Sequence, residues 1–361
     1  MKVSSIKNDG KFNLLVGTYT NSCASNGIYV FEFDAISGNI KMINSTANVI
    51  NPSYLSVSAD NKYVYAINEN GALSTLSAFE YNSKDYVLNF LNKEDTSGAD
   101  PCHLIDDELN VIVANYAGGS IAVFKKMPDY SISEVQQLIQ HEGKGIDKER
   151  QEKSHVHMVS FSPDKKFVLV NDLGLDKVFI YKYFPQAIHQ ILTLKDTINL
   201  KPGSGPRHSV FSADGKFMFL IHELDGTLTT FSYNKNGSLN ILNEINTTPE
   251  NFNGKISAAA LKISPDGKFL YLSNRGDLNS LSIYRIFKNG KLNFVERMST
   301  GGKEPRDFAI DPLGNFLLVG HQKTNNITVF KRNKINGSLT NTGQIINICA
   351  PVNLVFTKTT N

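Results

Sequence analysis

The sequence predicts an all-β protein: a seven-bladed β-propeller of four-stranded antiparallel blades, whose ring is closed by a C-terminal strand that pairs with the N-terminal blade. Three observations predict this fold. A pattern of two strands around a polar turn recurs about every 50 residues. Further strand-like segments follow most copies, and the last segment is a strand that the N-terminal blade lacks. We therefore expect residues 1–361 to form one propeller domain.

The repeated hairpin is clearest in "GPRHSVFSADGKFMFLIHEL", Gly205 to Leu224. Two apolar segments flank the turn Ser-Ala-Asp-Gly, whose residues favour tight turns. In an antiparallel hairpin the start of the first strand lies beside the end of the second. Similar stretches start near six anchor residues: Pro52, Pro101, His155, Pro206, Ser257 and Pro305.

After each hairpin comes a third strand, such as "KVFIYKY", and usually a weaker fourth strand after an Asn-Gly type of turn, such as "KNGSLNIL". Residues 136–151 show no clear period, and we expect a loop there. Four strands in a repeat of this length are typical of a propeller blade.

The first blade is predicted to be split between the two ends of the chain. The N-terminal segments "FNLLVGTY", "GIYVFEFD" and "GNIKMI" supply three strands, and "APVNLVFTK" at residues 350–358 supplies the innermost one. Pairing of these segments closes the ring and removes open sheet edges. The absence of tryptophan argues against the class of propellers with a Trp-Asp repeat.

Composition excludes several classes of function. A net charge of +3 is too small to indicate a nucleic-acid or membrane-surface partner. No run of 18 apolar residues predicts a membrane span, and the first residues show no signal peptide. Three widely spaced cysteines indicate neither a disulfide framework nor a zinc site. We expect a cytoplasmic protein without a cofactor.

The hairpins also predict where the chemistry lies. The first strand of a blade lines the central channel, so residues that flank the two hairpin strands should converge on one rim. Six of the eight histidines fall in this set, whereas the opposite rim holds only turn residues. The set is Asn68, Glu69, Cys102, His103, Asn115, Tyr116, His155, His157, Asp172, Arg207, His208, His222, Glu223, Asn274, Arg275, Arg306, His321 and Gln322.

Each of these residues also has a structural interpretation. Arg207 and Arg306, which each follow a proline, could form ion pairs between blades. Glu69 and Glu223 occupy equivalent sites and could accept hydrogen bonds from neighbouring Arg or His. Cys102 is expected to be a buried filler, because nothing marks its thiol as activated.

His155 and His157 are two residues apart, which places both on the same face of a strand. Such a pair can bind a metal, but the spacing offers no third ligand. We therefore expect no metal site.

Several motifs occur in order along almost the whole chain, from about residue 12 to residue 358: "VANYAGGSIAVF", "ERQEKSHVHMVSFSPD", "GPRHSVF" and "LSNRGDLNSLSIYRI". With them the sequence resembles the seven-bladed lactonase family, which includes the propeller-type 6-phosphogluconolactonases and the fungal carboxy-cis,cis-muconate cyclase. The resemblance implies an active site at the channel mouth with four catalytic residues, His157 (or His155 in its place), Arg207, Glu223 and Arg275. We expect five other rim residues to bind the substrate: His103, His155, Asp172, His208 and Arg306.

Two positions depart from the pattern. Asp307 stands where the repeat around His208 has histidine, and His222 stands where asparagine is expected.

The expected reaction is hydrolysis of a small anionic sugar lactone, most simply 6-phosphogluconolactone. Glu223 or His157 would be the base for the attacking water, and Arg275 or Arg207 would stabilise the oxyanion. The remaining arginine, with His208, would hold a phosphate or carboxylate.

Two alternatives stay open at this point. One is cycloisomerisation of a muconate at the same residues, with two arginines holding carboxylates. The other is a non-catalytic propeller that binds a ligand or protein. A cluster of Arg, His and Glu favours catalysis or anion binding, since protein docking sites usually carry aromatic anchors.

Overall fold

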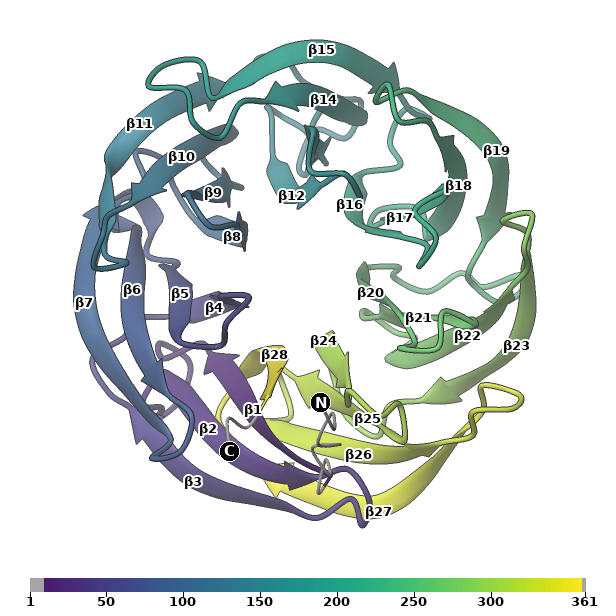
Figure 1. Ribbon diagram of the computed structural model, residues 1–361. Helices are drawn as coiled ribbons and strands as arrows, with labels where there is room; N and C mark the ends of the chain where they lie inside the picture. The colour runs from purple at the N-terminus through teal and green to yellow at the C-terminus, as the bar shows by residue number, and fades with distance from the viewer. Residues whose placement is uncertain (1–9, 359–361) are drawn as a thin grey trace, which may run out of the picture.

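The computed structural model describes residues 10–358, which form a closed ring of seven four-stranded antiparallel sheets around a central channel (Figure 1). The first four blades after the seam contain β4 (Pro52–Val57), β5 (Tyr63–Asn68), β6 (Thr75–Asn82), β7 (Val87–Asp95), β8 (Pro101–Asp106), β9 (Asn110–Asn115), β10 (Ser120–Lys126), β11 (Ile132–Gln140), β12 (Val156–Phe161), β13 (Phe167–Asp172), β14 (Lys177–Tyr183), β15 (Leu192–Asn199), β16 (Pro206–Phe211), β17 (Phe217–His222), β18 (Thr227–Tyr233) and β19 (Leu239–Asn246). The next two contain β20 (Ala258–Ile263), β21 (Phe269–Asn274), β22 (Ser280–Ile286), β23 (Leu292–Ser299), β24 (Pro305–Ile310), β25 (Phe316–His321), β26 (Asn326–Arg332) and β27 (Leu339–Asn347). A short 3-10 helix, η1 (Gly71–Leu73), follows β5.

The predicted split blade is confirmed. Its strand order is β28 (Pro351–Lys358), β1 (Lys11–Thr18), β2 (Ile28–Asp34) and β3 (Ile40–Thr46). β28 pairs antiparallel with β1 from the Phe12–Lys358 pair to the Thr18–Pro351 pair. The last described strand therefore forms the inner strand of the first blade, as Figure 1 shows near the marked chain ends.

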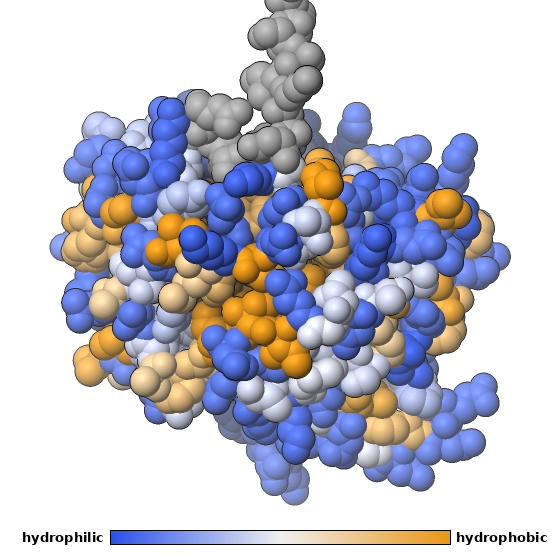
Figure 2. Space-filling model, turned by 90° about the horizontal axis from the view of Figure 1, so that it is seen from below, coloured by the Kyte–Doolittle hydropathy of each residue, from blue (hydrophilic) through white to orange (hydrophobic). Residues whose placement is uncertain are grey.

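The hydrophobic core is divided into layers between neighbouring blades. The second strand of a blade is buried on both faces; in β9, "NVIVAN", every residue is buried. One cluster, for example, packs Leu14 and Phe31 of the split blade against Leu318 and Val329 of the blade before it. In the outer strand β11, half-buried and exposed residues alternate after the buried Ile132, and Figure 2 shows a side of the ring on which hydrophilic surface surrounds hydrophobic patches.

Each inner strand has a β-bulge near its start, where its pairing with the second strand shifts by one residue. In the blade of β16 and β17, Pro206 pairs with His222 and His208 pairs with Ile221, so Arg207 is the extra residue. The other blades shift register at the equivalent place. A bulge redirects a side chain beside a regular ladder, and in three blades the bulge residue, Cys102, His157 or Arg306, lines the cavity at the channel mouth.

This register corrects two predicted anchors. Val156 and Ala258, not His155 and Ser257, pair with the last residue of the second strand. His155 therefore precedes β12, and the expected alternation with His157 is interrupted by the bulge. The ambiguous stretch 136–151 is also resolved, since β11 extends to Gln140 and a loop follows.

The cysteine interpretation was wrong for two of the three residues. Cys23 and Cys349 form a disulfide, with their Cα atoms 5.9 Å apart. They are 326 residues apart in sequence, but Cys23 follows β1 and Cys349 precedes β28, and these two strands pair. Ring closure therefore brings them together. Within residues 10–358, no helix has the length and apolar character needed to cross a membrane.

Candidate active site

Most side chains at the channel mouth come from two positions of the blade: the bulge residue of the inner strand and the residue that follows the second strand. The second of these is fixed by its backbone N–H, which donates across the hairpin to the carbonyl before the inner strand; for Glu223 the acceptor is Gly205, at 2.7 Å. The same bond recurs at Tyr19, Glu69, Tyr116, Leu173, Arg275 and Gln322. The repeat thus supplies a ring of positions whose side chains are free to differ.

Seven residues at these two positions, together with Arg150, line a cavity of about 150 Å³ at the mouth. Its lining is unusually rich in charge. The lining residues are Glu69, Cys102, Tyr116, Arg150, His157, Glu223, Arg275 and Arg306.

Glu223 is the centre of the cluster. Its Oε1 accepts a hydrogen bond from Arg150 Nη2 at 2.6 Å, and its Oε2 lies 2.8 Å from Arg207 Nε and 3.0 Å from Arg275 Nη2. Burial alone would raise the pKa of this carboxyl, but Arg275 and Arg207, with His157 and Arg150, hold it well below its ordinary value. Glu223 is therefore ionised at neutral pH.

The imidazole of His157 lies beside this carboxylate. Its Nε2 is 3.8 Å from Glu223 Oε2, and its Nδ1 is 3.6 Å from the sulfur of Cys102. Burial, reinforced by the positive charge of Arg207, lowers the pKa of His157 well below its ordinary value. The ring is neutral at pH 7 and can accept a proton. Burial also raises the pKa of the Cys102 thiol, which keeps it protonated and unreactive.

A second acidic group lies across the cavity from Glu223. The Glu69 carboxylate accepts a hydrogen bond from the Tyr19 hydroxyl at 2.8 Å, and the Arg306 guanidinium stacks over the Tyr19 ring at 5.5 Å. With Arg150, Arg207 and Arg275, the site contains four arginines against two glutamates, an excess of positive charge that favours an anionic ligand.

Arg207 takes a different place from the one expected. Its guanidinium is 2% exposed and bridges Glu223 and the carbonyl oxygen of Ala259, at 2.6 Å. It is absent from the cavity lining because it lies behind Glu223. Arg207 therefore forms an ion pair with Glu223, but this pair lies within one blade and not between blades as the structural interpretation expected.

Asp172, expected to bind substrate, lies outside the cavity. Its Oδ2 accepts hydrogen bonds from His141 Nδ1 at 2.8 Å and Ser154 Oγ at 2.6 Å, and its Oδ1 accepts from the backbone of His155. The carboxylate is fully buried and its acceptors are used within the protein. As the last residue of its strand it faces into the blade.

His155 also lies outside the cavity lining. Its ring stacks on Tyr116 with centroids 4.5 Å apart, and its Nε2 meets the carboxylate of Glu152 at 3.1 Å. It therefore supports the wall residue Tyr116.

His208 and His103 lie deeper in the channel. The His208 ring packs edge-on against His157 at 5.4 Å and against His103 at 5.5 Å. His103, which stacks on Tyr54, lines a separate cavity at the opposite face, where the Ser-x-Asp turns lie. The reason is the ladder register: both residues follow the bulge, so they face the channel below the mouth. Burial lowers the pKa of His103 to about 3.

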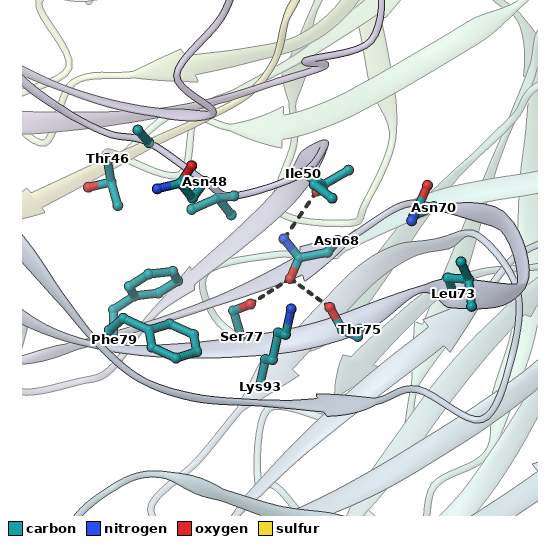
Figure 3. A pocket seen from close by; sticks show the side chains of 13 residues that line it. Thr46, Asn48, Ile50, Asn68, Asn70, Leu73, Thr75, Ser77, Phe79 and Lys93 are labelled. Carbon is teal, nitrogen blue, oxygen red and sulfur yellow. Dashed lines mark hydrogen bonds between the residues drawn. The ribbon is translucent and has the colours of Figure 1, made fainter.

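The last residue of the second strand has a structural role in other blades too. Figure 3 shows Asn68 in the wall of a second cavity, where it donates to the carbonyl of Ile50 and accepts from Thr75 and Ser77. His222 replaces asparagine at this position and bonds Thr229 at 2.8 Å. This departure from the family pattern therefore lies outside the cavity.

The cavity in Figure 3 is larger, about 600 Å³, but its chemistry is sparse. Of its lining residues only Lys93 is charged, and the others are apolar, amide or hydroxyl side chains. The larger of these two cavities is therefore not the better candidate for the active site. Within the described residues, no three His, Cys, Asp or Glu side chains are arranged to hold a metal ion.

Sequence reasoning missed two residues of the site. Arg150 comes from the loop between β11 and β12, which had no repeat partner; its signal was the unusual length of that polar connection. Tyr19 follows β1 of the split blade, and aligning that blade with the others would have placed it beside Glu69 in the rim set.

Known proteins of one family resemble this chain along almost its whole length. The model of the lactonase family, a 7-bladed β-propeller, matches residues 13–356. A 6-phosphogluconolactonase of Bacillus subtilis is 33% identical over 345 residues, which cover 94% of this chain and 97% of that protein. A 6-phosphogluconolactonase of Formosa agariphila is 36% identical over 90% of this chain and 94% of its own length. The structure of a periplasmic gluconolactonase of Pseudomonas aeruginosa superposes with a TM-score of 0.92 at 35% identity, covering 97% and 100% of the two chains. The chain belongs to the lactonase family of seven-bladed β-propellers.

Proposed function

We propose that the protein hydrolyses 6-phosphogluconolactone to 6-phosphogluconate at the channel mouth. One observation carries the proposal: a neutral imidazole and an excess of guanidinium groups converge on one buried carboxylate in a member of the lactonase family. The 6-phosphogluconolactonases among its relatives support the choice of substrate, a small anionic sugar lactone.

His157 is the better of the two candidate bases. It is neutral, and its Nε2 faces Glu223 at 3.8 Å, beyond hydrogen-bond distance. Glu223 is a poor base because three guanidinium groups hold its pKa low and occupy both oxygens. Its negative charge instead stabilises the imidazolium that forms when His157 accepts a proton.

The hydrolysis needs only the lactone and one water molecule. Water attacks the lactone carbonyl carbon and gives a proton to His157. Arg275, which lines the cavity, stabilises the negative charge that develops on the carbonyl oxygen. The bond from the carbonyl carbon to the ring oxygen breaks, and the ring oxygen takes the proton from His157. The product acid ionises and releases one proton to solvent.

The other predicted residues have supporting places in this scheme. Arg207 orients Glu223 from behind, and His208 packs against the base. The cavity lining does not include four residues that were expected to bind the substrate: His103, His155, Asp172 and His208. Arg306 lines the cavity and is available to an anionic ligand.

The proposal is tested with purified protein and freshly prepared 6-phosphogluconolactone, measuring 6-phosphogluconate formation against the spontaneous rate. We expect a rate well above the blank, and a rate equal to the blank would contradict the proposal. A carboxymuconate substrate in parallel tests the cycloisomerase alternative. Glucono-δ-lactone is a second candidate substrate, favoured by the similarity to the gluconolactonase of Pseudomonas aeruginosa.

A cytoplasmic location remains a prediction, and the disulfide weighs against it. Reducing compartments keep most thiols reduced, whereas disulfides persist in oxidising ones. The number of free thiols decides between a reducing and an oxidising compartment. It is counted in protein isolated from its native cells under alkylating conditions. Three free thiols would favour the cytoplasm, and one would favour an oxidising compartment.

A further inference from the structure

Arg150 differs from the other two arginines that contact Glu223. Its side chain is 39% exposed, whereas those of Arg207 and Arg275 are 2% and 8% exposed. Arg207 is fully enclosed by protein groups. Among these three arginines, Arg150 is therefore the one that can meet a group of the substrate that projects toward solvent.

The loop that carries Arg150 is an addition to the repeat. It spans residues 141–155 between β11 and β12 and is longer than the equivalent connection of every other blade, which runs from residues 348–350 before β28 to residues 247–257 before β20. A propeller blade does not need this length. The additional residues place the Arg150 guanidinium at the channel mouth. We therefore infer that the length of the loop serves ligand binding.

The loop is nevertheless held firmly at both ends. His141, at its start, bonds Asp172 at 2.8 Å and Tyr181 at 2.8 Å, and Ser154, near its end, bonds the same carboxylate. Beside Arg150, the fully buried Gln151 donates to the carbonyl of Leu173 at 2.8 Å. The backbone is thus fixed while the Arg150 side chain reaches into the cavity.

Arg150 also has hydrogen-bonding capacity to spare. Both of its side-chain hydrogen bonds, to Glu223 Oε1 at 2.6 Å and to the Tyr116 hydroxyl at 3.3 Å, use Nη2. Within the described residues, Nε and Nη1 have no protein acceptor. A guanidinium with unused N–H groups and partial exposure is suited to a phosphate, which accepts several such bonds.

We propose that Arg150 binds the phosphate of a phosphorylated sugar lactone and so sets the preference of the site for phosphorylated over unphosphorylated lactones. This inference rests on the proposed lactone hydrolysis. The phosphate lies several bonds from the lactone carbonyl, which accords with Arg150 at the exposed side of the cavity and His157 and Arg275 on its buried side.

The other arginines are less suited to this role. Arg207 and Arg275 are buried against Glu223, where Arg207 orients the carboxylate and Arg275 faces the reacting end of the substrate. Arg306 is stacked on Tyr19 beside Glu69, whose negative charge opposes a phosphate.

The test compares kcat/KM for 6-phosphogluconolactone and glucono-δ-lactone in the wild type, Arg150→Ala and Arg150→Gln. Glutamine keeps a donor for Glu223 and serves if the alanine variant folds poorly. Loss of a charge-assisted bond to phosphate should lower the ratio of the two kcat/KM values by about 10-fold to 100-fold, mainly through the KM of the phosphorylated substrate. Inhibition of glucono-δ-lactone hydrolysis by inorganic phosphate should weaken by a similar factor.

Lys148→Ala is the matched control, because Lys148 is an exposed cation on the same loop. We expect it to leave the ratio unchanged; a fall equal to that of Arg150→Ala would show a general charge effect and overturn the inference. An equal loss for both substrates in Arg150→Ala would also overturn it, as would a change of ratio in Arg306→Ala and not in Arg150→Ala. If the wild type hydrolyses only glucono-δ-lactone, the proposed substrate itself is wrong.

Discussion

At the scale of single residues, Glu223 shows how a position that recurs in every blade can carry a functional side chain in one of them. The backbone bond to Gly205 fixes its position as it does in the other blades, but the side chain is not required by the repeat. Three guanidinium groups offset the cost of burying its charge, because a buried carboxylate is stable only when paired and hydrogen-bonded. The sequence predicted two of these partners, Arg207 and Arg275, since both flank the hairpin strands. It did not predict Arg150, whose only signal was the unusual length of the loop between β11 and β12.

The pH dependence of the reaction follows from His157. Its lowered pKa means that the neutral base is already present at pH 6, and protonation removes it only as the pH falls well below 6.5. We expect kcat/KM for glucono-δ-lactone, which has no titrating phosphate, to be constant from pH 8 to 6 after subtraction of the spontaneous rate. A decline with a midpoint at or above 6.5 would argue against His157 as the base.

The placement of Asp172 predicts a role in stability. Asp172→Ala leaves His141, Ser154 and the backbone N–H of His155 without their buried acceptor. Each unsatisfied buried group costs about 1–3 kcal/mol, so the free energy of unfolding should fall by at least about 2 kcal/mol in urea titrations. An unchanged stability with a raised KM would instead restore the substrate-binding role that the sequence had suggested.

At the scale of strands and blades, the hairpins and their turns were readable because each uses local chemistry. In the turns Ser-x-Asp, the serine hydroxyl bonds the aspartate, as Ser212 does with Asp214 at 2.7 Å. The bulge was not readable, since it changes pairing without changing the alternation of residue types. This is why the anchors His155 and Ser257 were displaced by one residue and why His155 was placed on the wrong element.

The disulfide connects the ends of two paired strands, and it was missed because its cysteines are 326 residues apart in the sequence. It ties the segment after β1 to the start of β28, and Cys349 also lies 3.6 Å from the carbonyl of Tyr19. Cross-links that close long loops stabilise a fold by about 2–5 kcal/mol. We expect Cys23→Ser, and the wild type under reducing conditions, to unfold at lower urea concentration than the oxidised protein. Coincident unfolding curves for all three samples would contradict a stabilising role.

At the scale of the whole molecule, closure of the ring unites the two ends of the chain and the cavity. β28 forms the inner strand of the split blade, and Tyr19, which follows β1, places its hydroxyl on Glu69 of the next blade. The sequence predicted this architecture in full, because the repeat leaves one blade short of a strand and the final segment supplies it. The site depends on every contributing blade having the same register, so the ring determines which side chains meet.

The most direct test of the account is the turnover of Arg275→Ala with 6-phosphogluconolactone. Arg275 lines the cavity, and the equivalent position in other blades holds Tyr19, Glu69, Tyr116, Leu173, Glu223 and Gln322, so the blade does not need an arginine there. If its guanidinium stabilises the oxyanion, kcat should fall by about 10²-fold to 10³-fold. Arg275→Lys should recover only part of this loss, because a point charge does not replace the planar group.

Arg285→Ala is the control for this measurement, since Arg285 is an exposed arginine of the same blade. We expect Arg285→Ala to keep the wild-type rate, and Arg275→Ala to lose turnover while its thermal unfolding stays close to that of the wild type. A folded Arg275→Ala variant with the wild-type rate would contradict the placement of the active site, and a variant that unfolds would show that Arg275 serves the fold.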